Sequence, residues 1–213
     1  MSNDALILRL SANLMPVKRR SPWRDAAFLL LFWAAELAAI LGLGLMRPDM
    51  GQVIGSAYML WKLGSLALLA VVSCAIAVRS FSPMTTPGRG LLLMLALTGM
   101  TMSAGALVGS ADSVGSPFVH RLAPVHGLLC ASSILVMSLP ILAVMTHLMR
   151  RGAPTYPKGS ALAAGMAAAT SGALIFAFCC PVNDPLYVII WYAAGCATVT
   201  TMARWLLPGR FRL

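Results

Sequence analysis

The chain has 213 residues, of which 59% are hydrophobic and only 10% are charged, and its formal net charge is +10. Its mean hydropathy of +0.83 lies far outside the usual range of soluble globular domains, so the composition excludes an ordinary soluble enzyme or binding module. The basic residues are scattered over short segments and form no patterned domain, so we expect no direct nucleic-acid binding.

The first 23 residues precede the long apolar runs and are expected to form a cytoplasmic N-terminal segment. Four apolar residues in it follow helical spacing, namely Leu6, Ile7, Leu10 and Leu14. Such a helix can lie on anionic membrane lipid, or it can offer its apolar face to the groove of a cytoplasmic partner. Both interpretations stay open, and the four residues are candidates for partner binding.

Residues 24–213 are predicted to form one transmembrane domain. A helix that crosses a bilayer needs about 20 mostly apolar residues, and the chain supplies several such runs. We expect the first run to be a span rather than a cleavable leader. Because the connections are short, the predicted fold is all-α, an integral membrane bundle of six helices with up-down topology. The predicted spans are roughly 25–46, 53–78, 90–109, 124–148, 160–179 and 186–207.

The basic residues also predict the orientation of this bundle. If the N-terminus is inside, thirteen Lys and Arg residues lie on the cytoplasmic side, whereas only Arg47 and Arg121 lie outside. We therefore predict that both termini are cytoplasmic. The positive charge is expected to set the topology and to attract anionic lipid.

Two charged residues, Glu36 and Lys62, fall within the first two spans. In an antiparallel hairpin that turns at RPDMGQ they reach nearly the same depth, and a charge inside a membrane usually has a partner. We predict an intramembrane ion pair that fixes the register of the two helices. The alternative is a proton or ion pathway in a small transporter, although the chain lacks the clear repeat that transporters usually show.

Three of the five cysteines cluster towards the predicted outer face: Cys130 in the fourth span, and Cys179 and Cys180 at the end of the fifth. His126 stands four residues before Cys130, hence on the same helix face. Cys130, Cys180 and His126 can hold a transient metal ion. Alternatively the thiols can be oxidised or captured by electrophiles, with His126 tuning thiolate formation. Cys179 and Cys180 cannot easily bond to each other, because they are adjacent.

The loops contain no motif for catalysis. A membrane thiol oxidoreductase needs a shuttling Cys-x-x-Cys pair and a second relay pair, and neither spacing occurs. Phosphate-binding loops, nucleophile motifs and acid–base constellations are also missing from the sequence. We therefore predict that the protein is not an enzyme and has no resident cofactor.

Several longer strings are similar to one family over nearly the whole chain. They are RLSANLMPVKRRSPW before the first span, LGLMRPDM at the first outer turn, HGLLCASSILVMSLPILAVMTHLMRRGAPT through the fourth span, and FCCPVNDPLYVIIWYAAG. Together they resemble the NrsF-type anti-sigma factors, which are six-span inner-membrane proteins of proteobacteria. The last string is the most specific of these matches.

The resemblance implies a protein that holds an extracytoplasmic-function (ECF) sigma factor inactive at the bacterial inner membrane. Envelope stress, such as a heavy metal or an oxidant, would release the sigma factor. The family's two cysteines fall on Cys130 and Cys180, and Cys179 is an extra thiol beside them. All three are therefore candidate sensing thiols. Two rival functions stay open at this point: a small transporter that uses Glu36 and Lys62, and a structural helper of a larger membrane complex.

Overall fold

The computed structural model describes residues 7, 11–12, 21–83, 85–112, 124–152 and 154–208. Six helices in this part of the chain are long and apolar enough to cross a membrane. This confirms the predicted all-α class and the six spans, whose observed bounds lie within a few residues of the expected ones. The helices with defined bounds are α2 (Pro22–Gly42), α3 (Met50–Val53), α4 (Ala57–Ser80), α5 (Gly88–Asp112), α7 (Pro124–Arg151), α8 (Pro157–Ala177) and α9 (Pro185–Leu206).

Local chemistry fixes where several of these helices begin. Proline stands in the first turn of α2, α8 and α9, where its missing N–H is not needed. The Ser56 side chain accepts a hydrogen bond from the backbone N–H of Met59 and caps α4. The Asp184 carboxylate accepts one from the N–H of Leu186 at 2.9 Å and caps α9. The Asp184 cap therefore fixes where the α8–α9 connection ends and α9 begins.

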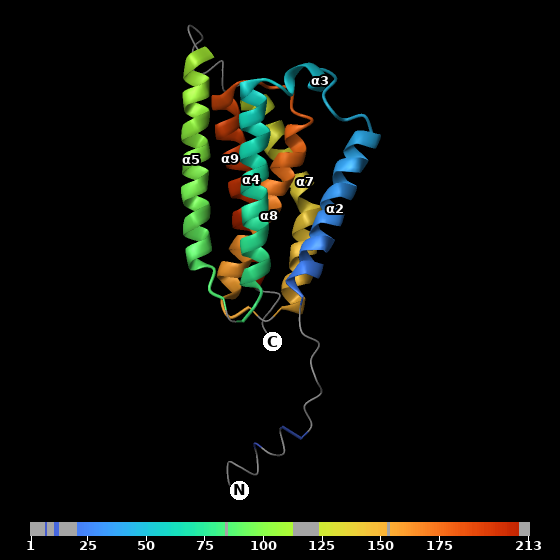
Figure 1. Cartoon of the computed structure of the whole chain (residues 1–213), viewed down its shortest axis with the longest axis vertical. Coiled ribbons are helices and arrows are strands. Elements are labelled where there is room, and N and C mark those ends of the chain that lie inside the picture. The colour runs from blue at the N-terminus through green and yellow to red at the C-terminus, as the bar shows by residue number, and fades with distance from the viewer. Residues whose placement is uncertain are drawn as a thin grey trace.

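The bundle is arranged around α8. In Figure 1 the long helices run side by side in alternating directions, so α2 begins and α9 ends at the same end of the bundle. Helix α8 packs against α4, α7 and α9, whereas α2 and α5 lie at the periphery. In the most apolar stretch of α8, 89% of the residues are buried, against 11% for both α2 and α5. The remaining surface of the peripheral helices is apolar, as lipid contact requires.

Small residues allow this close approach to α8. A Cβ added to Gly172 would lie 2.8 Å from the backbone nitrogen of Ser138 in α7, and one added to Gly165 would lie 3.0 Å from the Cα of Thr200 in α9. Helices in a membrane associate through such contacts, because lipid supplies no hydrophobic force between them. The Ala-, Gly- and Ser-rich sequence of α8 therefore explains its central place.

The predicted N-terminal segment is only sparsely covered by the structure. Leu6, Leu10 and Leu14 lie outside the described residues, and Ile7 is described with its side chain exposed. The amphipathic helix, its role in partner binding and the cytoplasmic placement of both termini stay predictions.

Candidate thiol site

The end of α8 gives two adjacent cysteines different surroundings. The helix ends at Ala177, yet the backbone N–H groups of Cys179 and Cys180 still bond to the carbonyl of Phe176, at 2.9 and 3.0 Å. This last tight turn carries the Cys180 side chain into the bundle, where it is 0% exposed. Cys179 is only partly buried. Neighbours in sequence thus occupy two different environments.

Cys180 meets the second predicted thiol inside the bundle. Cys130 on α7 and Cys180 are both buried free thiols, and they belong to the same buried apolar cluster. The Cys130 sulfur lies 3.3 Å from the hydroxyl of Tyr187 on α9. Apolar residues, among them Ile134 and Phe176, surround the pair. The structure therefore brings together the two cysteines that the family resemblance singled out.

Lys62 on α4 also reaches this site, which the sequence analysis did not expect. Its side chain is 1% exposed, and its Nζ lies 3.5 Å from the carbonyl oxygen of Val182, just after Cys180. The same Nζ lies 5.9 Å from the ring centre of Tyr58 and 5.4 Å from that of Tyr192. A cation over aromatic faces is favourable when water is excluded. The contact with Val182 places the Lys62 ammonium group close to the connection that begins with Cys180.

The predicted ion pair between Glu36 and Lys62 is not formed. Within the described residues, Glu36 Oε2 has no hydrogen-bond partner. Depth along a hairpin predicts the height of a residue but not the direction it faces, and Lys62 faces α9 and the α8–α9 connection instead of α2. The transporter interpretation was built on this pair, so we do not pursue it.

Arg47, in the connection between α2 and α3, holds the loop that carries Cys180. Its side chain is 2% exposed, and its Nε and one terminal nitrogen donate to the two oxygens of Asp49, at 2.7 and 2.6 Å. The other terminal nitrogen donates to the carbonyl of Cys180 at 3.3 Å and to Oδ1 of Asn183 at 2.9 Å. The backbone N–H of Arg47 donates to the carbonyl of Phe178 at 3.2 Å. The planar guanidinium suits this simultaneous contact.

From the sequence, Arg47 was expected only to mark the outer side of the membrane. The available signal was its place in LGLMRPDM, one of the strings that carried the family resemblance. The hydrogen bond and the charge of Asp49 raise the pKa of Arg47, and Arg47 in turn lowers the pKa of Asp49. Arg47 and Asp49 are therefore both charged at all physiological pH values. The hydrogen bonds from Arg47 to the Cys180 carbonyl and to Asn183 consequently do not depend on pH in this range.

The surroundings shift the two adjacent thiols in opposite directions. The hydrogen bond from Cys130, followed by the charge of Lys62 and the N–H of Val182, lowers the pKa of Cys180 to about 5, against the opposing effect of burial. Burial and the nearby charge of Cys180 raise the pKa of Cys179. A thiolate is the nucleophilic form of cysteine, so Cys180 is the more reactive of the two by ionisation.

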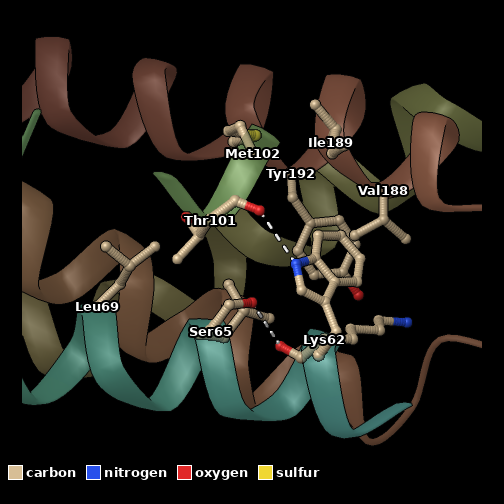
Figure 2. A pocket seen from close by; sticks show the side chains of 10 residues that line it. Lys62, Ser65, Leu69, Thr101, Met102, Val188, Ile189 and Tyr192 are labelled. Carbon is tan, nitrogen blue, oxygen red and sulfur yellow. Dashed lines mark hydrogen bonds between the residues drawn. The ribbon is translucent and has the colours of Figure 1, made fainter. Parts of the chain in front are cut away.

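A small cavity adjoins Lys62 between α4, α5 and α9. Figure 2 shows the residues around it. The indole N–H of Trp61, which also lines the cavity, donates to the carbonyl of Thr101 at 3.0 Å. Tyr192 and Val188 line it from α9. Its volume is about 40 Å³, which holds a few water-sized molecules. Lys62 also lines this cavity, although Figure 2 shows its terminal nitrogen pointing away from the other lining side chains.

The predicted contribution of His126 is absent from this site. Its side chain is exposed, whereas Cys130, one turn further along α7, is buried. In the described part of the chain, no three His, Cys, Asp or Glu side chains are grouped so that they can hold a metal ion. The set of Cys130, Cys180 and His126 is therefore not assembled. His126 and Cys130 lie on the same face of α7, but His126 is in the first turn of the helix, where this face is exposed.

Comparison with known proteins agrees with the resemblance found in the sequence. The anti-sigma-F factor NrsF of Caulobacter vibrioides is 28% identical, with 100% of this chain and 99% of that protein aligned. The probable anti-sigma-F factor NrsF of Azospira oryzae is 25% identical, with 92% of each chain aligned. No solved structure matches.

The family match covers almost the whole chain. The model of the family described as "NrsF: Negative regulator of sigma F" matches residues 10–212. That description is of a regulator, in agreement with the prediction that the protein is not an enzyme. The chain therefore belongs to the NrsF family of negative regulators of sigma F.

Proposed function

We propose that this protein is an anti-sigma factor of the bacterial inner membrane that binds an ECF sigma factor and releases it under envelope stress. The family and the names of the two relatives support the anti-sigma role. The observation that carries the sensing role is that Cys130 and Cys180, two buried free thiols, lie in the same apolar cluster at one end of the bundle. A heavy metal or an oxidant is the proposed signal.

The site is well placed to pass a signal through the bundle. The residues of the site come from four helices or their ends: Lys62 from α4, Cys130 from α7, Cys180 from the end of α8 and Tyr187 from α9. A chemical change at the thiols would therefore alter the packing of all four helices. Helix α8 packs against the other three along its length. Modification of the thiols would favour a second arrangement of these helices, as in other two-state switches. The other end of the bundle, with both termini, would face the cytoplasm.

The sigma factor would bind at that cytoplasmic end. The candidate surface is the N-terminal segment, with Leu6, Ile7, Leu10 and Leu14 as the apolar contacts. Lys18, Arg19 and Arg20 follow this segment and would hold it near anionic lipid. A partner that displaced the lipid would keep the sigma factor at the membrane.

The experiment is a capture from bacterial membranes with the tagged full-length protein, followed by mass spectrometry. We expect one small sigma factor to be recovered, and to be lost after treatment with cadmium or an oxidant. In Cys130→Ser and Cys180→Ser, release should fall to background, while Cys196→Ser, a matched control, should release normally. Release that is unchanged in both thiol variants would refute the sensing role.

The docking surface is tested separately. Replacing Leu6 and Leu10 with Asp should abolish recovery of the sigma factor before any treatment, because charge on the apolar face opposes burial in a partner's groove. Recovery equal to that of the unmodified protein would place the docking surface elsewhere on the cytoplasmic end.

A further inference from the structure

We propose that the groove between the ends of α7 and α9 binds one anionic phospholipid, with the phosphate at Arg150 and His147 and one acyl chain along the apolar part of α7. The inference goes beyond the proposed function, because it gives the bundle a lipid ligand at the end opposite to the thiol site.

The groove lies where α7 and α9 pack against each other. Six of its lining residues belong to α7, and two, Leu206 and Leu207, come from the end of α9. Its volume is about 360 Å³, which is within the range of sites for small molecules. Leu139 is 49% exposed and Leu206 is 57% exposed, so the groove opens onto the lipid-facing surface of the bundle.

The sequence of α7 gives this groove an apolar end and a basic end. Residues four apart lie on one face of a helix, so α7 lines the groove with two neighbouring rows. The rows are Leu139, Ala143, His147 and Leu142, Thr146, Arg150. Each begins with a leucine, passes through a smaller residue and ends with a basic one, over about 16 Å in all. The groove therefore has the polarity of an amphiphile.

The middle of the groove asks for no polar group from a ligand. The hydroxyl of Thr146 donates to the carbonyl of Leu142 within α7, at 2.7 Å. Ala143 is exposed and has a small side chain, which leaves space between its larger neighbours. An apolar chain can therefore lie along this part of α7 without burying an unpaired donor.

The charge at this end of the bundle is strongly positive. Of the described residues there, one is acidic, Asp25 in the first turn of α2, and seven are basic: Arg24, Arg79, Arg89, Arg150, Arg151, Lys158 and Arg204. From residue 113 to 213 the sequence contains one acidic residue, Asp184, which caps α9 at the opposite end. This is the predicted cytoplasmic end, where basic pockets between spans bind anionic headgroups.

The two basic residues of the groove suit a phosphate. Arg150 and His147 are both exposed, so a headgroup can reach them. A guanidinium donates two parallel hydrogen bonds to phosphate oxygens, and an imidazole N–H can donate a third. The charge and the donors therefore favour an anionic lipid over an uncharged one.

The depth of the groove favours a lipid over a soluble ligand. Leu139 lies about 18 Å along α7 from the end of that helix, near the middle of a hydrocarbon core about 30 Å thick. A soluble phosphate would satisfy only the basic end, and a soluble protein does not reach the apolar end. A second copy of the chain would bring its own basic end close to this one, which like charges oppose.

The test is native mass spectrometry of the purified full-length protein in detergent, titrated with dioleoyl phosphatidylglycerol or dioleoyl phosphatidylcholine. These lipids have the same acyl chains and differ in headgroup charge. We expect one phosphatidylglycerol to bind at least about tenfold more tightly than phosphatidylcholine. Arg150→Gln should weaken phosphatidylglycerol binding by about fivefold. Arg89→Gln removes an equally exposed charge outside the groove and should leave binding unchanged.

A second pair of variants tests the apolar part of the groove without changing any charge. Ala143→Phe fills the groove, and the loss of about two methylene contacts should weaken phosphatidylglycerol binding by about tenfold. Ala96→Phe, on the exposed surface of α5, is the matched control and should bind like the unmodified protein. Binding that depends on Arg150 but not on Ala143 would mean general attraction to a basic surface, and it would overturn the site.

Two further outcomes would also overturn the proposal. Equal affinity of the unmodified protein for the two lipids would do so without any variant. A dimer that Ala143→Phe dissociates, with lipid binding unchanged, would assign the groove to contact between two copies of the chain. These assays contain neither a sigma factor nor an oxidant, so their failure leaves the proposed function untouched.

Discussion

Two sets of cysteines in one bundle show how different the surroundings of a thiol can be. At one end, Cys130 and Cys180 lie in one buried cluster, where Tyr187 contacts Cys130 and Lys62 contacts the connection after Cys180. Deeper along the helices, the sulfur of Cys74 lies 3.8 Å from the hydroxyl of Ser171. The sulfur of Cys196, in turn, lies 3.6 Å from the carbonyl of Ala169. Within the described residues, neither of these two deeper thiols interacts with a charged side chain.

The difference comes from the end of a helix. In the interior of α8 the backbone groups bond within the helix, and mostly small side chains pack against its neighbours. Where α8 ends, free backbone carbonyls can accept hydrogen bonds from buried cations, and Arg47 and Lys62 both donate to this turn. Buried charged side chains are therefore found at the α8–α9 connection, and they can change the ionisation of the thiols there, whereas within the described part of the chain the deeper thiols have no such neighbours.

The largest effect is expected for Arg47→Met, because this variant removes the hydrogen bonds that hold the connection after α8, where Cys180 lies. The buried carbonyl of Cys180 loses its donor, and so does the side chain of Asn183, which is exposed. We expect a loss of about 3 kcal/mol of unfolding free energy. Thermal unfolding of the purified protein, followed by tryptophan fluorescence, measures it.

Asp49→Asn is the matched control for that variant. Asp49 is 45% exposed, so water can replace much of its interaction, and its loss should cost clearly less stability. Equal destabilisation by the two variants would mean that the ion pair, rather than the contact with the Cys180 loop, determines the effect.

The sequence predicted the helices and the thiol pair but not the cations around it. Long apolar runs specify spans because each must satisfy its own backbone in lipid, and the FCCPVNDP string marked the end of α8. Lys62 was assigned to Glu36 from depth alone. Which way a residue faces depends on the packing of α4 against α8 and α9, and a single sequence does not contain this information directly. Arg47 was missed for the same reason.

The pH dependence of alkylation compares the two adjacent thiols, Cys179 and Cys180, which differ in surroundings although they lie in the same turn. Lowering the pH from 8 to 6 protonates an ordinary or raised thiol, so labelling of Cys179 by a small alkylating reagent should slow by about 100-fold. The pKa of Cys180 is lowered to about 5, so its labelling should change by less than about threefold. Each thiol serves as its own reference, which separates ionisation from access. Parallel slowing of both would show that their surroundings do not differentiate them.

Ser171→Ala addresses the smallest effect, at the deeper thiol Cys74. If charge rather than hydrogen bonding sets thiol reactivity in this bundle, removing the hydroxyl near Cys74 should change its alkylation rate by less than about threefold. The cost in stability should be about 1 kcal/mol, since a sulfur–hydroxyl contact at 3.8 Å is weak. A tenfold change in rate would mean that a neutral hydrogen bond controls reactivity here. The two thiol regions would then differ in degree, and Lys62 would not be what distinguishes them.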